Sequence, residues 1–301
     1  MEIGFIILSH QNPGLLRRLI LRLNHSFGDP PIVCHHDFHQ TTLNKESFPS
    51  NVRFVPEPVR TRWGHITVVR AVLLALRQLY DWKAPDWFVH LSGSDYPIKG
   101  GDGIHSELLC SPYDAYLDYR PIEYGTLPKE KRDSAFELGF RRPFWTRVAY
   151  DRYVARRIPY LWINRKAKLC TRRFPLRHPV LTSPRPFKKL TCFAGDAWMS
   201  GRRRCAELLL SPDNEIQALL DHYADRVVPE ESFFHTVLCN APGLKLCNDN
   251  KRYEDWTAGE LHPKTLGLED LPKLISSGQH FARKFSDLHD PRVLDELDRV
   301  I

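Results

Sequence analysis

The chain of 301 residues contains 42% hydrophobic and 26% charged residues, proportions that are ordinary for a globular protein. Its length allows one large α/β domain or two smaller ones, with enough apolar surface for a substantial core. No run in the sequence approaches the roughly 18 consecutive apolar residues of a transmembrane helix. The first residues lack a basic leader and a small-residue cleavage site, so neither a membrane span nor a signal peptide is expected.

The formal net charge of +7 is concentrated in one stretch of the chain. Residues 120–190 contain 19 Lys and Arg against 5 Asp and Glu, a balance of +14. No clean hydrophobic period persists here, and we expect an excursion from the main sheet that is partly helical around residues 145–170. Basic residues interleaved with aromatic ones can bind nucleic acid, but no known nucleic-acid-binding motif appears. We therefore expect an anionic membrane surface or a lipid-linked acceptor as the partner, and no nucleic acid.

Seven cysteines are scattered along the chain without a Cys-x-x-Cys pair. Zinc-binding and redox motifs use such pairs, so the sequence supports neither. We expect most cysteines to be reduced and buried as small apolar side chains, which favours a cytoplasmic location.

The first third of the chain alternates between strand and helix patterns. Ile3–Leu8 is an apolar run that suits a buried parallel strand. The Asn-Pro pair that follows is a suitable cap and first residue for a helix. Residues 31–37 and 52–55 are expected to be the next strands, and 67–80 a largely buried helix. This opening is typical of nucleotide-binding domains, although Gly-x-Gly-x-x-Gly is absent.

The chain around residues 87–99 indicates a ligand-binding edge. The apolar run Trp87–Leu91 ends in Ser92-Gly93-Ser94-Asp95, and a proline then turns the chain. Ligands of open α/β sheets bind beyond the carboxyl ends of strands. Small residues there let a ligand approach the backbone, and Asp95 offers a hydrogen-bond acceptor. The same residues also suit an ordinary exit from a strand into a loop.

Two neighbouring glutamates, Glu230 and Glu231, follow Pro229 at the expected start of an apolar helix. Negative charge in the first turn stabilises a helix dipole, which is a sufficient structural reason for both. The same dipole lowers the pKa of a carboxyl group, so a catalytic base here needs an apolar or acidic surrounding to offset it. The residues alone leave both interpretations open.

Several segments in succession resemble those of one enzyme family. The first is Leu-Ser-Gly-Ser-Asp-Tyr-Pro-Ile at 91–98, and the second is Val-Pro-Glu-Glu-Ser-Phe-Phe-His-Thr-Val-Leu at 228–238. Arg-Tyr-Glu-Asp-Trp at 252–256 and Phe-Ala-Arg-Lys-Phe at 281–285 follow in the expected order. Together they resemble the core-2/I-branching β-1,6-N-acetylglucosaminyltransferases and the related peptide O-xylosyltransferases. The resemblance runs through most of the chain and fades over residues 120–190.

The resemblance implies an α/β fold, as a single GT-A-like (Rossmann-like) glycosyltransferase domain over residues 1–301. Its central sheet would be mostly parallel. The basic excursion at 120–190 would contact the acceptor or a membrane surface. The implied reaction moves a sugar from a UDP-sugar to an acceptor hydroxyl of a glycan or lipid-linked glycan, with inversion. GlcNAc is the favoured sugar and xylose the next. The alternative is a non-catalytic protein that binds a nucleotide sugar or a glycan on the same fold.

The resemblance also implies roles for individual residues. Glu231 matches the glutamate that serves as catalytic base. Arg252 and Lys284 match the basic side chains at the diphosphate. The donor site is expected to include Asp37, Ser94 and Asp95. The residues expected to contact the acceptor or the sugars are Trp198, Glu230 and Trp256. Trp198 suits stacking on a sugar and filling a core equally well.

Neither a metal nor another cofactor is expected. His35 and His36 lack a third ligand at a suitable spacing, and the chain has no Asp-x-Asp, the motif with which many glycosyltransferases hold a divalent cation. The family that the chain resembles works without a metal. Eukaryotic members usually carry an N-terminal membrane anchor that this sequence lacks. We therefore expect a cytoplasmic enzyme that can rest peripherally on the inner membrane.

Overall fold

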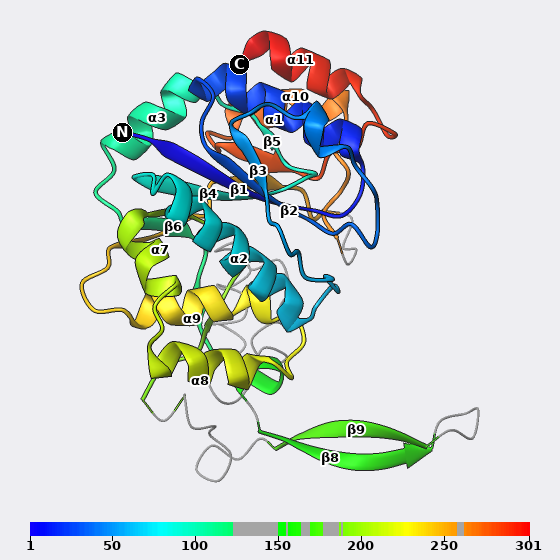
Figure 1. Ribbon diagram of the computed structural model, residues 1–301, viewed down its shortest axis with the longest axis vertical. Coiled ribbons are helices and arrows are strands. Elements are labelled where there is room, and N and C mark those ends of the chain that lie inside the picture. The colour runs from blue at the N-terminus through cyan, green and yellow to red at the C-terminus, as the bar shows by residue number, and fades with distance from the viewer. Residues whose placement is uncertain (123–149, 155, 164–168, 177–186, 188, 258–261) are drawn as a thin grey trace.

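The computed structural model describes most of the chain, with helices on both faces of a central sheet (Figure 1). The described residues are 1–122, 150–154, 156–163, 169–176, 187, 189–257 and 262–301. Every structural statement below concerns these residues.

The central sheet has seven strands in the order β12-β6-β11-β4-β1-β2-β3. Strand β1 pairs in parallel with β2 and β4, and β2 with β3, whereas β11 lies antiparallel between β4 and β6. The α/β fold with a mostly parallel central sheet, expected from the sequence, is thereby confirmed. The strands are β1 Ile3–Ser9, β2 Ile32–His36, β3 Val52–Phe54, β4 Trp87–Ser92, β6 Ala115–Leu117, β11 Ser200–Arg202 and β12 Leu246–Asn248.

Two hydrophobic cores lie on opposite faces of this sheet. Successive strand residues point to opposite faces, so Phe5 and Ile7 belong to one core and Ile6 to the other. The core with Phe5 is completed by α1 Pro13–Phe27, α3 Gly101–Leu109, α10 Leu271–Ser276 and α11 Arg292–Val300. The core with Ile6 is completed by α2 Ile66–Trp82, α7 Arg203–Leu209, α8 Asn214–Tyr223 and α9 Phe233–Asn240. Short 3₁₀ turns lie at η1 Lys45–Ser47 and η5 Leu268–Asp270.

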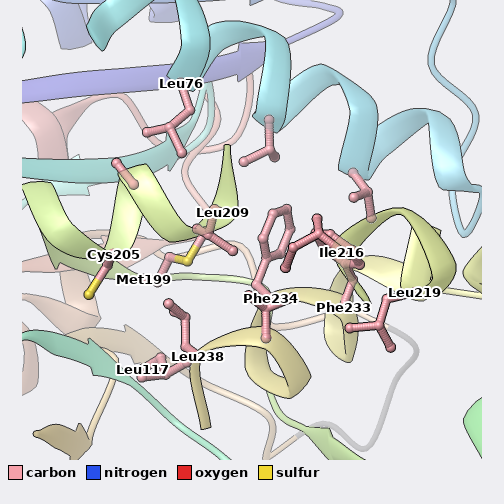
Figure 2. Packing of buried hydrophobic residues seen from close by; sticks show 14 of the residues in the cluster. Leu76, Leu117, Met199, Cys205, Leu209, Ile216, Leu219, Phe233, Phe234 and Leu238 are labelled. Atoms are coloured by element: carbon pink, nitrogen blue, oxygen red, sulfur yellow. The ribbon is translucent and has the colours of Figure 1, made fainter. Parts of the chain in front are cut away.

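Helix α9 is anchored in the second core by two phenylalanines (Figure 2). Phe233 and Phe234 are both fully buried, and their rings meet edge to face at a centroid distance of 5.3 Å. Side chains of α7 and α8, including Leu209 and Ile216, surround them in Figure 2. This packing fixes α9 and, with it, the turn that carries the two glutamates.

A second, smaller sheet lies where β4 ends. It has the order β13-β14-β5, formed by β13 Arg252–Glu254, β14 Phe281–Arg283 and β5 Tyr96–Pro97. Strand β14 pairs in parallel with β13 and antiparallel with β5. A further short pair joins β7 Arg120–Pro121 to β10 Phe193–Ala194. Segments that are far apart in the sequence therefore meet at the carboxyl end of β4.

The described part of the basic excursion combines a short helical segment with a hairpin. Its described part is a two-stranded antiparallel hairpin, β8 Arg156–Ile163 with β9 Leu169–Leu176, preceded by a short π-helical segment, η2 Tyr150–Val154. The hairpin extends away from the body of the protein in Figure 1. The partly helical character expected around 145–170 is found at η2, whereas the sequence did not predict the hairpin, in which Pro159 and the β-branched and aromatic residues around it suit strands.

The glutamate turn also differs in detail. A 3₁₀ turn, η4 Pro229–Glu231, is separated from α9 by Ser232, whose backbone φ of −140° interrupts the helix. The Ser232 hydroxyl donates to the Phe193 carbonyl oxygen at 2.7 Å, which fixes the interruption. Glu230 and Glu231 therefore precede α9 and are not in its first turn.

Phe234→Ala should lower the free energy of unfolding by about 3–5 kcal/mol, because the truncation leaves a cavity between α9, α7 and α8. Urea denaturation followed by circular dichroism measures this change. Leu288→Ala is the control, since this side chain is 93% exposed; it should stay within about 0.5 kcal/mol of the wild type. Equal losses in the two variants would contradict the described core.

Candidate active site

Asp95 fixes the turn at the end of β4. Its side chain is fully buried. One carboxylate oxygen accepts from the Ser92 hydroxyl at 2.6 Å and the other from the Ser92 backbone N–H at 3.0 Å. Ser94 lies in the same turn, where its hydroxyl contacts that of Ser92 at 3.0 Å and its carbonyl accepts from the backbone N–H of Phe285. The Asp95 carboxylate is thus engaged within the protein.

Arg283 of β14 joins the two buried carboxylates of this edge. Its Nε donates to Asp95 at 3.1 Å and its Nη1 to Glu254 at 3.3 Å. The guanidinium carbon lies 4.3 Å from the centre of the Trp198 ring, within cation–π range. Burial opposes the charged form, but the attraction of Asp95 and Glu254 raises the pKa of Arg283 above its usual value. Arg283 is therefore a permanent cation at the edge of the small sheet.

Glu254 of β13 accepts hydrogen bonds from both tryptophans that were predicted to contact the acceptor or the sugars. One carboxylate oxygen accepts from Trp198 Nε1 at 3.1 Å, and the other accepts from Trp256 Nε1 at 2.8 Å. Trp198 also packs against His90, with ring centroids 5.1 Å apart and planes tilted by 43°. Neither Glu254 nor Arg283 was among the residues predicted from the sequence. Both lie inside matched segments, Arg-Tyr-Glu-Asp-Trp at 252–256 and Phe-Ala-Arg-Lys-Phe at 281–285, and this position was the available signal.

Arg252 lies beneath this edge. Its guanidinium donates to the His90 carbonyl oxygen at 2.9 Å and to the carbonyl oxygens of Asn250 and Lys251 at 3.3 Å. Only 4% of the residue is exposed, and burial lowers the pKa of Arg252 to about 10. Its positive charge is therefore held behind the small sheet, with the described groups around it supplying backbone acceptors.

Lys284 and Asp37 lie near the carboxyl ends of β1 and β2. Asp37 is almost fully buried and accepts from the Thr61 N–H and hydroxyl, from Gln40 and from the His39 N–H. Burial disfavours its charge, yet these hydrogen bonds lower the pKa of Asp37 to about 2. Lys284 is partly exposed, and no described residue pairs with its ammonium group.

His10 connects these two residues electrostatically. Burial lowers its pKa most, Asp37 acts to raise it and Lys284 to lower it. Both charges therefore act on the same imidazole. The ammonium of Lys284 remains available at this edge, whereas the acceptors of Asp37 already have partners.

Glu231 is held by two residues of the excursion that the sequence did not indicate. The Tyr153 hydroxyl donates to a Glu231 carboxylate oxygen at 2.9 Å, and Arg152 Nη1 lies 3.4 Å from the same oxygen. The Glu231 carbonyl accepts from the Gly195 backbone N–H at 2.9 Å. A side chain at 195 would collide with the Asp118 carbonyl oxygen at 2.0 Å, so only glycine allows this approach. The chain that leads to Trp198 is thereby fixed against Glu231.

Glu230 has a different environment from its neighbour. It is 7% exposed, and one of its carboxyl oxygens is buried without a hydrogen-bond partner among the described residues. Burial is the main cause that raises the pKa of Glu230 to about 8; the charge of Glu231 adds to it, and Arg152 opposes it. At neutral pH Glu230 is therefore mostly protonated, whereas the Glu231 carboxyl beside it is paired with Arg152.

The histidine pair at the end of β2 is used within the protein. His35 accepts from the Val59 N–H at 3.0 Å, and His36 contacts the Ser9 hydroxyl and the Thr41 carbonyl oxygen. Across the described part of the chain, no three His, Cys, Asp or Glu side chains are grouped as metal ligands.

The structure thus gathers the candidates at the strand ends in connected groups. Asp95, Trp198 and Trp256 share the Arg283–Glu254 contacts, with Arg252 behind them. Asp37 and Lys284 meet around His10, and Glu231 is linked to the Trp198 segment through Gly195.

Fold and site together are those of a GT-A-like α/β domain. The chain belongs to the Core-2/I-Branching enzyme family, whose match covers residues 4–120 and 161–276. Beta-glucuronosyltransferase GlcAT14B of Arabidopsis thaliana is 27% identical over 237 residues, which cover 76% of this chain and 46% of that protein. Xylosyltransferase 1 of Homo sapiens is 25% identical over 327 aligned residues, which cover 99% of this chain and 30% of that protein. The chain thus spans less than half the length of these relatives.

Glu230→Gln should stabilise the protein at alkaline pH. The folded state raises the pKa of Glu230 from 4.5 to about 8. The unfolded state therefore loses this proton first, and Glu230 costs stability as the pH rises from about 4.5 to 8. The variant should gain roughly 5 kcal/mol over the wild type near pH 9 and lose this gain near pH 4.

Urea unfolding at several pH values measures this difference. Glu215→Gln, at an exposed position on α8, is the matched control and should follow the wild type at every pH. A Glu230→Gln advantage that is independent of pH would contradict a protonated Glu230.

Proposed function

We propose that this chain is an inverting, metal-independent glycosyltransferase that moves a sugar from a UDP-sugar to an acceptor hydroxyl of a glycan or glycoconjugate. The observation that carries the proposal is the Glu231 carboxylate, oriented by Tyr153 and Arg152 and tied through Gly195 to the segment of Trp198. Membership of the Core-2/I-Branching enzyme family supports it.

Glu231 is the proposed catalytic base. It takes the proton of the acceptor hydroxyl while that oxygen attacks the anomeric carbon from the face opposite the UDP. The new carbon–oxygen bond forms as the bond to the β-phosphate oxygen breaks, and the configuration inverts. The hydrogen bond from Tyr153 and the charge of Arg152 hold the Glu231 carboxylate ionised and oriented for this step.

Cationic side chains are proposed to stabilise the departing UDP. Lys284 has a partly exposed ammonium group, and the adjacent Arg283 presents a guanidinium that is suited to phosphate oxygens. Arg252 is proposed to add a buried positive charge behind Lys284 and Arg283. Positive groups placed where negative charge develops can replace a metal ion in this task. Asp37 and Asp95 would shape the donor site through the loops that they fix, with Ser94 in the Asp95 turn.

The donor sugar is the finer part of the proposal. The sequence favours GlcNAc, then xylose, and the names of the relatives add glucuronic acid and again support xylose. These sugars differ at C2 and C5, so a donor panel with one acceptor mixture separates them. Trp198, Trp256 and Glu230 are the proposed neighbours of the acceptor or the reacting sugars.

The deciding experiment measures UDP release by the purified protein with UDP-GlcNAc, UDP-xylose and UDP-glucuronic acid, with and without excess chelator. We expect release with one donor and no change on chelation. Glu231→Gln should reduce transfer by about 100- to 10,000-fold, because the base is lost, while UDP binding by calorimetry stays as in the wild type.

Glu46→Gln, which changes an exposed carboxylate in η1, is the matched control and should keep full activity. Retained transfer by Glu231→Gln would refute the base assignment, and loss of activity on chelation would refute metal independence. Measurable UDP binding without turnover of any donor would instead indicate a non-catalytic binding protein.

We also propose that the excursion contacts an anionic membrane surface on the cytoplasmic side, which its balance of +14 supports. Among the described helices, none has the length and apolarity to cross a bilayer. Reversing four charges of the hairpin (Arg156, Arg157, Arg172 and Arg173 to Glu) should weaken binding to phosphatidylserine vesicles at least about 100-fold, since each basic residue near the surface contributes about 1 kcal/mol. Sedimentation with vesicles measures this binding, and an unchanged affinity would contradict the contact.

A further inference from the structure

Among the described residues, Glu254 is the carboxylate that contacts both tryptophans and the arginine of the small sheet. Its side chain is 2% exposed. It accepts from Trp198 at 3.1 Å, from Arg283 at 3.3 Å and from Trp256 at 2.8 Å. The three donors come from separate segments of the chain. Among the described side chains, no other residue contacts all three of them, so the carboxylate connects these segments.

The geometry fixes the orientation of these groups as well as their distance. An indole has a single N–H donor, so a hydrogen bond from it fixes one axis in the plane of the ring. Two indoles that donate to one carboxylate therefore constrain each other's position, and the Arg283 guanidinium on the Trp198 ring further restricts that ring's plane. Arg283 is fixed at three points: Nε on Asp95, Nη1 on Glu254, and the guanidinium face on the Trp198 ring.

This arrangement leaves one edge of Arg283 unused. No described residue accepts a hydrogen bond from its Nη2, and 18% of the side chain is exposed. The contacts on Nε and Nη1 therefore determine where Nη2 points. Removing Glu254 would leave the guanidinium held by Asp95 and by the face of a Trp198 ring that has itself lost its hydrogen-bond acceptor, so the direction of Nη2 would be less well fixed.

Glu254 contributes negative charge beside two buried guanidinium groups. The pKa of Arg252 responds to Asp95, Glu254, Arg283 and Asp249, so these groups lie within electrostatic reach of Arg252. Loss of the Glu254 charge makes this cluster more positive by one unit, which would attract an anion more strongly.

We propose that Glu254 is a positioning residue of the donor site, which orients the free edge of Arg283 and the indole of Trp256 for transfer. The inference rests on the proposed function and deepens it. In this role Glu254 neither takes the proton of the acceptor hydroxyl nor binds a phosphate of the UDP. It acts through the three described groups that donate hydrogen bonds to it. Its removal should therefore affect the rate of transfer and spare nucleotide binding.

Glu254→Gln tests the inference. The amide keeps the size of the side chain but offers one acceptor oxygen in place of two, so one indole N–H faces an N–H₂ group. We expect kcat to fall about 100-fold, the loss that a small misplacement of catalytic groups produces. UDP should bind as tightly as to the wild type or more tightly, because a negative charge is removed. General damage to the fold would weaken both.

A second readout needs no substrate. The chain has seven tryptophans, and in a protein with ¹⁵N-labelled indoles we expect the N–H signals of Trp198 and Trp256 to shift in Glu254→Gln while the others stay. Assignment uses Trp198→Phe and Trp256→Phe. Trp256→Phe keeps a ring and removes one donor, so it should lower kcat less than Glu254→Gln does, and it carries the kinetic test if Glu254→Gln does not fold.

Glu296→Gln is the matched control, because it removes a surface carboxylate on α11 that pairs with Arg299. It should leave kcat, UDP affinity and the indole signals unchanged. Glu254→Gln with wild-type kcat, or with weakened UDP binding, would overturn the positioning role. Unmoved indole signals would overturn the contacts themselves. A wild-type protein without turnover would overturn the proposed function and its dependent role, while the indole signals would still report the contacts.

Discussion

The rest of the site depends on how one buried anion is neutralised. Asp95 has no exposed surface, and an uncompensated charge in that position would cost several kcal/mol. Ser92 and Arg283 supply the compensation, and Arg283 belongs to a strand far along the chain. The ion pair therefore joins the small sheet to the end of β4. It also sets Lys284, the next residue, at the same edge.

The carboxyl groups near the strand ends differ in chemistry because their partners differ. Asp37 accepts several hydrogen bonds and has a pKa of about 2, so it is ionised, but its carboxylate oxygens already have partners. Glu230 lacks a described partner for one oxygen and has a pKa of about 8, so it carries a proton at neutral pH. Glu231 is paired with a phenol and a guanidinium and lies partly open. These environments support the proposed role of Glu231 as the base.

The sequence predicted what depends on local pattern and short motifs. Apolar runs gave β1 and β4, and helical periodicity gave α1 and α2, because burial on a sheet requires these patterns. The roles of Glu254 and Arg283 depend on pairing between distant strands, which no local pattern encodes. The hairpin was missed although Pro159 already argued against a helix. Tyr153 stands where the resemblance fades, so no motif indicated it.

The position of Tyr153 and Arg152 has a consequence for how such enzymes diversify. Both lie in the excursion, the stretch proposed to meet the acceptor, and both support the carboxylate proposed as base. If the proposed roles hold, one segment of the chain both recognises the acceptor and orients the base. Replacing this segment with that of a relative would then alter both properties in a single step. Under the proposed function, acceptor choice could therefore not be changed independently of catalysis.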